Sequence, residues 1–215
     1  MGTHVLVHNC TVEDTELLAR NNITAFWEMT WWRMLWIDTS LDTIIKNSAL
    51  RMPHNLLTGR LVRRHQKIID HGTGQIIGYA RWILPEVCAP CWLEAQTPDV
   101  SEDNKRVFEN QFAEASWAIR DDMPGFDDPL EQMMKRNSPT EPYINHQRKG
   151  IASLLLESGI KQAKKLNLSI FLVAIGSKAL ALYQKYGFDL VDQNSQDLRP
   201  WGFHDSYDTY ILLKR

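Results

Sequence analysis

The chain has 215 residues, of which 44% are hydrophobic and 23% charged, as expected for one soluble globular domain. A formal net charge of -2 argues against broad binding to nucleic acid or to a membrane surface, so any anion site must be local. Three cysteines cannot form an even disulfide framework, and the N-terminal sequence lacks the pattern of a signal peptide. We therefore expect a cytoplasmic protein with no membrane span.

The N-terminal third predicts a strand followed by helices. His4–Cys10 is an apolar run typical of a strand. Thr11 with Asp14 three residues later is an acidic variant of the capping box. The helical pattern extends from there through Glu13–Trp36, with a break expected near Glu28–Thr30.

Gly59–Pro85 predicts a β-hairpin whose turn is His71–Gly74. The first strand of this hairpin carries four cationic residues: Arg60, Arg63, Arg64 and Lys67. We interpret them as the solvated face of a strand, and a nucleic-acid patch is the less favoured alternative.

Residues 86–143 form a less regular, charge-rich insert. Within it, apolar residues at helical spacing predict an amphipathic helix over Asn104–Arg120. Pro139 and Pro142 interrupt the segment that precedes residue 144, and a central strand is not expected there.

The last third has the clearest pattern. A helix over Ile151–Lys165 is followed by a continuously apolar strand at Leu168–Ile175, of the kind that is buried on both faces. A short helix then ends at Gly187, and two closing strands complete the chain.

The segment "INHQRKGIASLLL" places a cationic, glycine-containing turn at the start of the first of these helices. A helix N-terminus has unpaired N–H groups and a partial positive charge, which together favour phosphate. Gly150 would let ligand oxygens approach the backbone, and small Ala152 would keep the next turn open. The candidate binding residues are Gln147, Arg148, Lys149, Gly150, Ile151, Ala152 and Ser153.

Two motifs in this region resemble those of the GCN5-related N-acetyltransferases, the GNAT superfamily. Gln147, Gly150 and Ala152 fit the pattern Q/R-x-x-G-x-G/A, and "ALALYQKYGF" fits A-x-x-L-Y-x-x-x-G-F about thirty residues later. The order of the other predicted elements also agrees with the family, and "GYARWILP" resembles the third strand of small GNAT proteins of filamentous fungi.

The resemblance implies an α/β (α+β) GNAT fold: a central mixed, mostly antiparallel twisted sheet flanked by helices, here with a degenerate fourth strand. It implies a single domain over residues 1–215, with an acceptor-side part at 1–143 and a coenzyme A-binding half at 144–215. The family's first motif binds the pyrophosphate of acetyl-CoA. Its tyrosine, here Tyr183, lies near the coenzyme sulfur and often acts as general acid.

Four of the eight tryptophans lie within "FWEMTWWRMLW". Core packing is the default interpretation, because Trp27, Trp31 and Trp32 fall roughly on one helical stripe. The functional alternative is an apolar acceptor pocket, formed by Phe26, Trp27, Met29, Trp31 and Trp32. An exposed aromatic patch could equally form a homodimer contact.

Three functional hypotheses follow. The first is an N-acetyltransferase that uses acetyl-CoA on a small apolar or aromatic acceptor by direct transfer. The second is a GNAT-fold protein that has lost acyl transfer and binds or converts a small aromatic ligand by unrelated chemistry. The third is a redox protein based on Cys88 and Cys91, and no metal site or nucleic-acid partner is predicted.

Overall fold

The computed structural model describes residues 5–36, 38–117, 120, 123, 125–139, 143–150 and 152–215, and leaves the side chains of 5, 144–150 and 152 undescribed. Seven strands form one sheet in the order β1-β2-β3-β4-β5-β7-β6. They are β1 (Val5–Asn9), β2 (Arg63–Asp70), β3 (Gln75–Ile83), β4 (Tyr143–Gly150), β5 (Ser169–Ile175), β6 (Asp189–Asp197) and β7 (Ser206–Lys214). Every neighbouring pair is antiparallel except β4 and β5, which are parallel.

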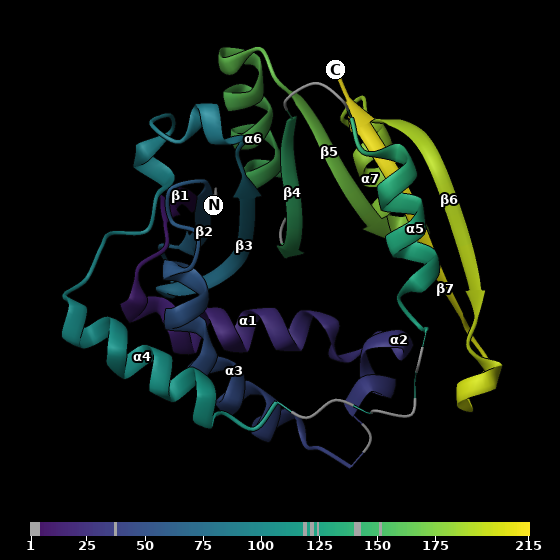
Figure 1. Cartoon of the computed structure of the whole chain (residues 1–215), viewed down its shortest axis with the longest axis horizontal. Helices are drawn as coiled ribbons and strands as arrows, with labels where there is room; N and C mark the ends of the chain where they lie inside the picture. Colours follow the sequence, from purple (N-terminus) through teal and green to yellow (C-terminus); the bar gives the residue numbers. More distant parts are fainter. Residues whose placement is uncertain are drawn as a thin grey trace.

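Helices cover both faces of the sheet (Figure 1). They are α1 (Thr15–Trp27), α2 (Thr30–Arg33), α3 (Leu41–Leu57), α4 (Glu102–Glu114), α5 (Asp128–Asn137), α6 (Ala152–Leu166) and α7 (Ser177–Lys185). Short 3₁₀ turns are η1 (Val12–Asp14), η2 (Met34–Trp36), η3 (Glu86–Cys88), η4 (Leu93–Ala95) and η5 (Arg199–Trp201).

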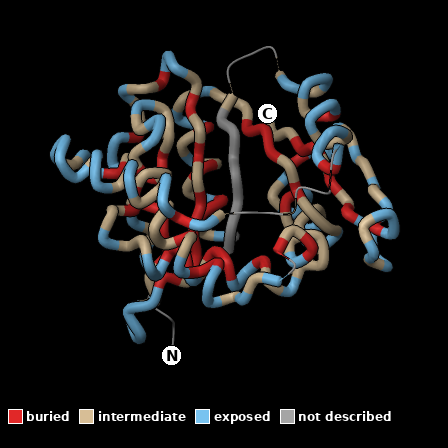
Figure 2. The backbone as a smooth tube through the Cα atoms, turned by 60° about the horizontal axis from the view of Figure 1, so that its bottom comes forward, coloured by how far each residue is buried: buried red, intermediate tan, exposed pale blue. Residues whose placement is uncertain are grey.

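Alternating residues of β3 divide the core into two layers. Trp82 packs with α6 and α7 on one face, whereas Tyr79 packs with α1 and α3 on the other. Met133 of α5 packs on the same sheet against Phe171 and Ile211 of β5 and β7. Buried positions accordingly gather along the strands and the helix segments beside them (Figure 2).

The expected mixed, mostly antiparallel sheet is confirmed, as are several local predictions. Thr11 and Asp14 form the capping box, and the Thr11 N–H donates to the Asp14 carboxylate at 2.7 Å. The long helical pattern breaks where expected, because α1 ends at Trp27 and α2 begins at Thr30. The hairpin of β2 and β3 turns at residues 71–74.

The expectation that no central strand precedes α6 is wrong. Both prolines precede Tyr143 in the sequence, so neither lies within the ladder of β4. Residues 145–150 of β4 pair with β3, and residues 143–146 pair with β5. This pairing on both edges forms a strand from a sequence with little alternation, because sheet context outweighs local propensity.

The insert at 86–143 is more helical than its sequence indicates. The predicted helix over Asn104–Arg120 is present as α4 but ends at Glu114, where Ala115 adopts an extended conformation. A second helix, α5, was not predicted. It is only ten residues long, and Leu130, Met133 and Met134 are its only apolar side chains apart from Pro129, so the apolar pattern is too short to stand out in a charge-rich segment.

The cationic run on β2 is not a solvated face. Arg64 is fully buried and Lys67 nearly so. The Arg64 guanidinium donates to the main-chain carbonyls of Ala89, Cys91 and Trp92 at 2.6–3.1 Å. Arg64 thus holds the irregular segment after β3 against the sheet, and a buried cation satisfied by carbonyl oxygens replaces the expected surface charge.

Substitution of Gly159 with alanine should destabilise the protein by about 2 kcal/mol. A Cβ at this α6 position would fall within the space occupied by the fully buried Trp82 ring. Overpacking of this kind costs about 1–3 kcal/mol, which exceeds the gain in helix propensity from glycine to alanine. Urea unfolding measures the change, and Lys161→Ala on the exposed side of the same helix is the control. Equal stability of Gly159→Ala and wild type would contradict the packing described here.

The free energy of unfolding should decrease at acidic pH because of His65. Burial, reinforced by nearby arginines led by Arg81, lowers the pKa of His65 to about 3, and its Nδ1 lies 2.8 Å from the Tyr79 hydroxyl. An unfolded histidine titrates near pH 6.5, so the unfolded state takes up the proton first as pH falls. The stability contributed by neutral His65 is present above pH 6.5 and is lost as the pH falls towards 3.

Between pH 7 and pH 4 this loss amounts to about 3 kcal/mol. His65→Gln, which keeps a hydrogen-bonding group beside Tyr79, should remove that part of the pH dependence. The measurement is the free energy of unfolding of both proteins at the two pH values. Parallel pH profiles would contradict the assignment.

Candidate active site

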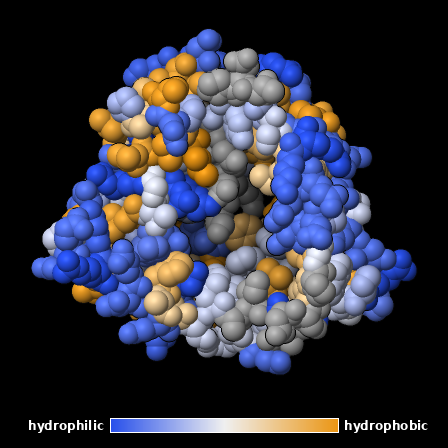
Figure 3. Space-filling view, in the orientation of Figure 1, coloured by the Kyte–Doolittle hydropathy of each residue, from blue (hydrophilic) through white to orange (hydrophobic). Residues whose placement is uncertain are grey.

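Strands β4 and β5 separate along their length. Their ladder comprises four residue pairs, from Tyr143 with Ser169 to His146 with Leu172, and ends there among the described residues. Both strands nevertheless continue, β4 along β3 to Gly150 and β5 along β7 to Ile175. Figure 1 shows the two strands diverging towards their C-terminal ends, and Figure 3 shows a hollow in this face of the molecule.

The divergence exposes one main-chain edge of each strand to the opening. Residues 147–150 of β4 are paired with β3 on the other edge, and residues 173–175 of β5 are paired with β7. A β-strand edge offers N–H and C=O groups in a row to any extended ligand that lies along it. The opening can therefore bind a chain of amide groups through main-chain hydrogen bonds.

Helix α6 begins beside the wide end of this opening, and one residue separates it from the end of β4. The N–H groups of Ala152, Ser153 and Leu154 in its first turn have no intrahelical acceptors, and the helix dipole adds partial positive charge. The predicted turn at residues 147–150 is instead the last half of β4, so the first-turn amides are the only part of the predicted cradle that the structure places at a helix start. Ile151 lies outside the described residues.

Tyr183 lies on α7, which follows β5 after Gly176. Gly176 has a φ of 78°, a backbone conformation that favours glycine. The Tyr183 side chain is fully buried and packs edge-to-face on Phe188, with ring centroids 5.5 Å apart. The described structure thus places Tyr183 in the core next to the strand that borders the opening.

An aromatic cluster lies at the open end of β5. Ile175, the last residue of β5, belongs to a cluster that contains Trp31 of α2, Tyr207 of β7 and Phe203. The Trp31 and Tyr207 ring centroids are 5.2 Å apart. Helices α1 and α2 lie across the ends of the central strands in Figure 1, so this cluster joins the opening to the helices.

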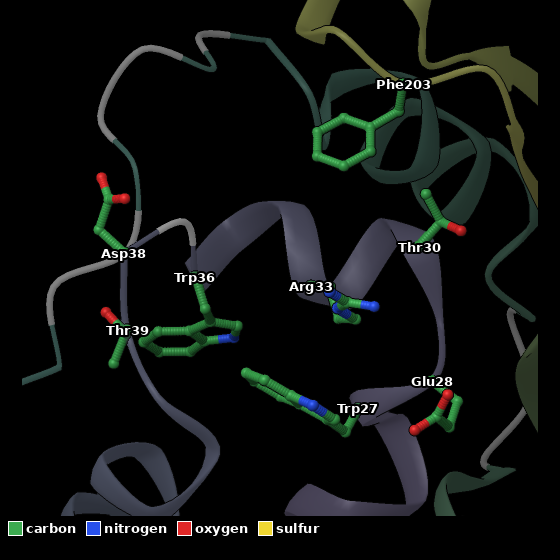
Figure 4. A pocket seen from close by; sticks show the side chains of 8 residues that line it. All are labelled: Trp27, Glu28, Thr30, Arg33, Trp36, Asp38, Thr39 and Phe203. Atoms are coloured by element: carbon green, nitrogen blue, oxygen red, sulfur yellow. The ribbon is translucent and has the colours of Figure 1, made fainter.

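A cavity of about 480 Å³ opens between the α1–α2 region and the connection from β6 to β7. Figure 4 shows Trp27 and Trp36 side by side on one side of it, with Phe203 on the other. Its wall also carries two carboxylates, Glu28 and Asp38, and one guanidinium, Arg33. Aromatic surface combined with a small number of charged groups is typical of a site for a small organic ligand.

The five predicted acceptor residues come together, but they do not line one pocket. Phe26 is buried and contacts both Trp31 and Trp32, with ring centroids 5.9 and 5.7 Å away. Of the five, only Trp27 lines the cavity of Figure 4, and Trp32 lines a separate cavity. The break after Trp27 turns α2 away from α1, which removes the single helical stripe expected from the sequence.

Sequence reasoning missed the opposite wall of this cavity. Phe203 is remote from α1 in the chain and follows a short 3₁₀ turn that carries no distinctive pattern. Asp38 also lines the cavity and has a φ of 69°, which is uncommon outside glycine. No local motif indicates either residue, because the fold alone brings them to the tryptophans.

Cys88 and Cys91 do not have the setting of a redox pair. Cys88 lies at the C-terminal end of η3, and burial raises the pKa of its thiol. A reactive thiol needs the opposite shift, usually from a helix N-terminus or a neighbouring cation. Among the described residues, no three histidine, cysteine or acidic side chains are grouped so as to hold a metal ion.

Comparison with known proteins shows which family and which solved structures share this geometry. Residues 145–188, which include the diverging strand, α6 and Tyr183, match the Acetyltransferase (GNAT) family. The solved C-terminal condensation domain of Ebony, in complex with beta-alanyl-dopamine, is similar over 99% of both chains, with a TM-score of 0.63 and 13% identity. The chain has the GNAT fold.

Two further solved structures are similar over most of both chains. A histone acetyltransferase HPA2 and related acetyltransferase from Corynebacterium glutamicum has a TM-score of 0.56 and 18% identity, over 100% of this chain and 96% of that one. A provisionally assigned arylalkylamine N-acetyltransferase 7 from the yellow fever mosquito has a TM-score of 0.57 and 12% identity, over 98% and 87%. No curated protein sequence matches the chain.

No helix in the described residues of this GNAT fold is both long and apolar enough to cross a membrane.

Proposed function

We propose that the chain is an N-acetyltransferase that transfers the acetyl group of acetyl-CoA directly to a small aromatic amine. The observation that carries the proposal is the divergence of β4 and β5 after the pair His146 and Leu172. An opening with free main-chain edges suits the two amide groups of the pantetheine arm. The match of residues 145–188 to the GNAT family supports the same use of the opening.

The coenzyme diphosphate would lie at the N-terminus of α6. Unpaired amides of Ala152, Ser153 and Leu154 and the helix dipole favour a dianion there. Arg148 and Lys149, which immediately precede this turn in the sequence, would add positive charge. These residues, with Gln147, Gly150, Ile151 and Ser153, are the proposed coenzyme-binding set.

The acceptor amine would bind in the cavity of Figure 4. Its ring would lie against Trp27 and Trp36, and its ammonium group would be attracted by Glu28 and Asp38. An aromatic amine fits the ligand of the similar Ebony domain, beta-alanyl-dopamine. It also fits the name arylalkylamine N-acetyltransferase of the similar mosquito protein.

The reaction requires a neutral amine next to the thioester. The amine nitrogen attacks the carbonyl carbon, the C–N bond forms and the C–S bond breaks. The bound ammonium loses one proton to water before the attack and a second as the amide forms, and the leaving coenzyme thiolate takes up one proton. We assign this last transfer to the Tyr183 hydroxyl, which a phenol can perform if it comes within hydrogen-bond reach of the sulfur.

Thiol release tests the proposal. The purified protein is incubated with acetyl-CoA and 2-phenylethylamine, and free coenzyme thiol is followed with a chromogenic disulfide. We expect release that depends on both substrates, and much slower release with the aliphatic polyamine spermidine. No amine-dependent release with any arylalkylamine would overturn the proposal.

A second candidate is a GNAT-fold protein that binds a small aromatic ligand without transferring an acetyl group from acetyl-CoA. Two observations favour it. Residues 147–150 are paired in β4, where a phosphate-binding turn was expected, and Tyr183 is fully buried. In that case 2-phenylethylamine would bind in calorimetry, whereas acetyl-CoA would neither bind nor be consumed.

A further inference from the structure

A second cavity, of about 280 Å³, lies between α1, α3 and β3. Its polar wall includes Arg51, Arg81, Asn22 and Ser48, and its apolar wall includes Trp32 and Trp117. A layer of tryptophans separates it from the cavity of Figure 4, because Trp36 lies between Trp32 and Trp117 with ring centroids 5.7 and 4.7 Å away. It is therefore a different site from the proposed acceptor pocket.

The cavity has two cations and no acidic group in its described wall. Neither Arg51 nor Arg81 forms an ion pair or hydrogen bond with any described residue. Burial lowers the pKa of both guanidinium groups, and Arg63 adds further positive charge near Arg81. Because arginine stays charged in proteins, the described part of the wall leaves this positive charge without a compensating acidic group.

Arg51 is held in a position suited to an anion. Its guanidinium carbon lies 3.9 Å from the Phe112 ring centroid and 5.1 Å from that of Trp117. Stacking of this kind uses the flat face of the guanidinium and leaves its N–H groups available at the edge. Those donors match the geometry of a carboxylate.

Two further polar groups in the wall have no partner among the described residues. Asn22 is 5% exposed and its buried Oδ1 accepts no hydrogen bond, and the buried Nε1 of Trp32 donates none. Leaving a buried donor or acceptor unsatisfied costs about 1–3 kcal/mol. A ligand with oxygen acceptors and a polar hydrogen would remove part of that cost.

We propose that this cavity binds a small aromatic carboxylate. Its carboxylate would pair with Arg51 and Arg81, and its ring would occupy the space between Trp32, Trp117 and the aliphatic side chains of Ile23 and Met52. The small volume admits a single ring with a short chain and excludes a nucleotide. A monocarboxylate fits better than a polyanion because apolar groups form much of the wall.

Calorimetry with two matched probes tests the proposal on the wild-type protein. Phenylacetate carries the carboxylate, and phenylacetamide is its neutral analogue. We expect phenylacetate to bind at least about tenfold more tightly than phenylacetamide, as loss of a charged pairing predicts. Equal affinity for the two, or no phenylacetate binding at about 10 mM, would overturn the proposal.

Substitutions of single arginines identify which cavity binds phenylacetate. Arg51→Gln and Arg81→Gln should each weaken phenylacetate binding by at least about tenfold, whereas Arg33→Gln in the other cavity should not. Arg51→Lys and Arg81→Lys keep the charge and should retain part of the affinity, which separates a binding defect from misfolding. Unchanged affinity in both glutamine variants would contradict the assignment. Thiol release from acetyl-CoA is measured independently. A negative result for phenylacetate binding therefore does not contradict the proposed transferase activity.

Discussion

Replacing Ala152 with glutamate should abolish binding of acetyl-CoA while leaving the fold intact. Ala152 is the first residue of α6, where the proposal places the coenzyme diphosphate. A carboxylate there would repel the diphosphate and fill the space in front of the amides. The same charge is favourable for the helix itself, by about 0.3–1 kcal/mol, because it lies at the positive end of the dipole. Stability and coenzyme affinity should therefore change in opposite directions.

Calorimetry measures the effect, and we expect a loss of affinity of about a thousandfold, equivalent to about 4 kcal/mol. Asn104→Glu is the matched control, because it adds the same charge to the first turn of the distant helix α4. It should leave coenzyme affinity unchanged. If Ala152→Glu binds acetyl-CoA with full affinity, the diphosphate does not bind at the start of α6.

The second large effect is expected from Tyr183→Phe. If the phenol protonates the leaving thiolate, its removal should lower kcat by about 10²–10⁴-fold with little change in the KM for acetyl-CoA. The phenylalanine ring keeps the contact with Phe188, so the free energy of unfolding should change little. Steady-state kinetics and urea unfolding measure the two quantities on the same preparation.

Tyr186→Phe provides the control for this variant. Tyr186 follows α7, and its hydroxyl donates to the exposed Glu157 carboxylate at 3.0 Å. Its loss should leave kcat near the wild-type value. Tyr183→Phe with undiminished turnover would show that the coenzyme thiolate takes its proton from another source, such as water.

The sequence predicted the parts of the fold that local patterns determine. The capping box of Thr11 and Asp14, the β2–β3 hairpin and the helix–strand–helix order after residue 150 all follow from signals within a few residues. Strand β4 could not be predicted in this way. Its formation depends on β3 and β5, which are distant in the chain, and its own sequence lacks alternation.

The burial of the charged residues Arg64 and Lys67 could not be predicted from the sequence either. Arg64 and Lys67 are in a strand rich in cations. Only the fold shows that Arg64 donates to the carbonyls of Ala89, Cys91 and Trp92, and that Lys67 pairs with Asp14 at 2.5 Å. The tryptophans were identified, but their division between two cavities depends on the break after Trp27 and on Phe203 and Trp117. The cytoplasmic location, the dimer contact and the fungal resemblance stay predictions.

A crystal structure of the complex with coenzyme A tests the central claim most directly. We predict that the pantetheine arm lies between residues 147–150 of β4 and residues 173–175 of β5. The diphosphate oxygens should lie about 3 Å from the amide nitrogens at the start of α6. A complex in which the coenzyme binds elsewhere, or in which β4 and β5 pair along their whole length, would contradict it.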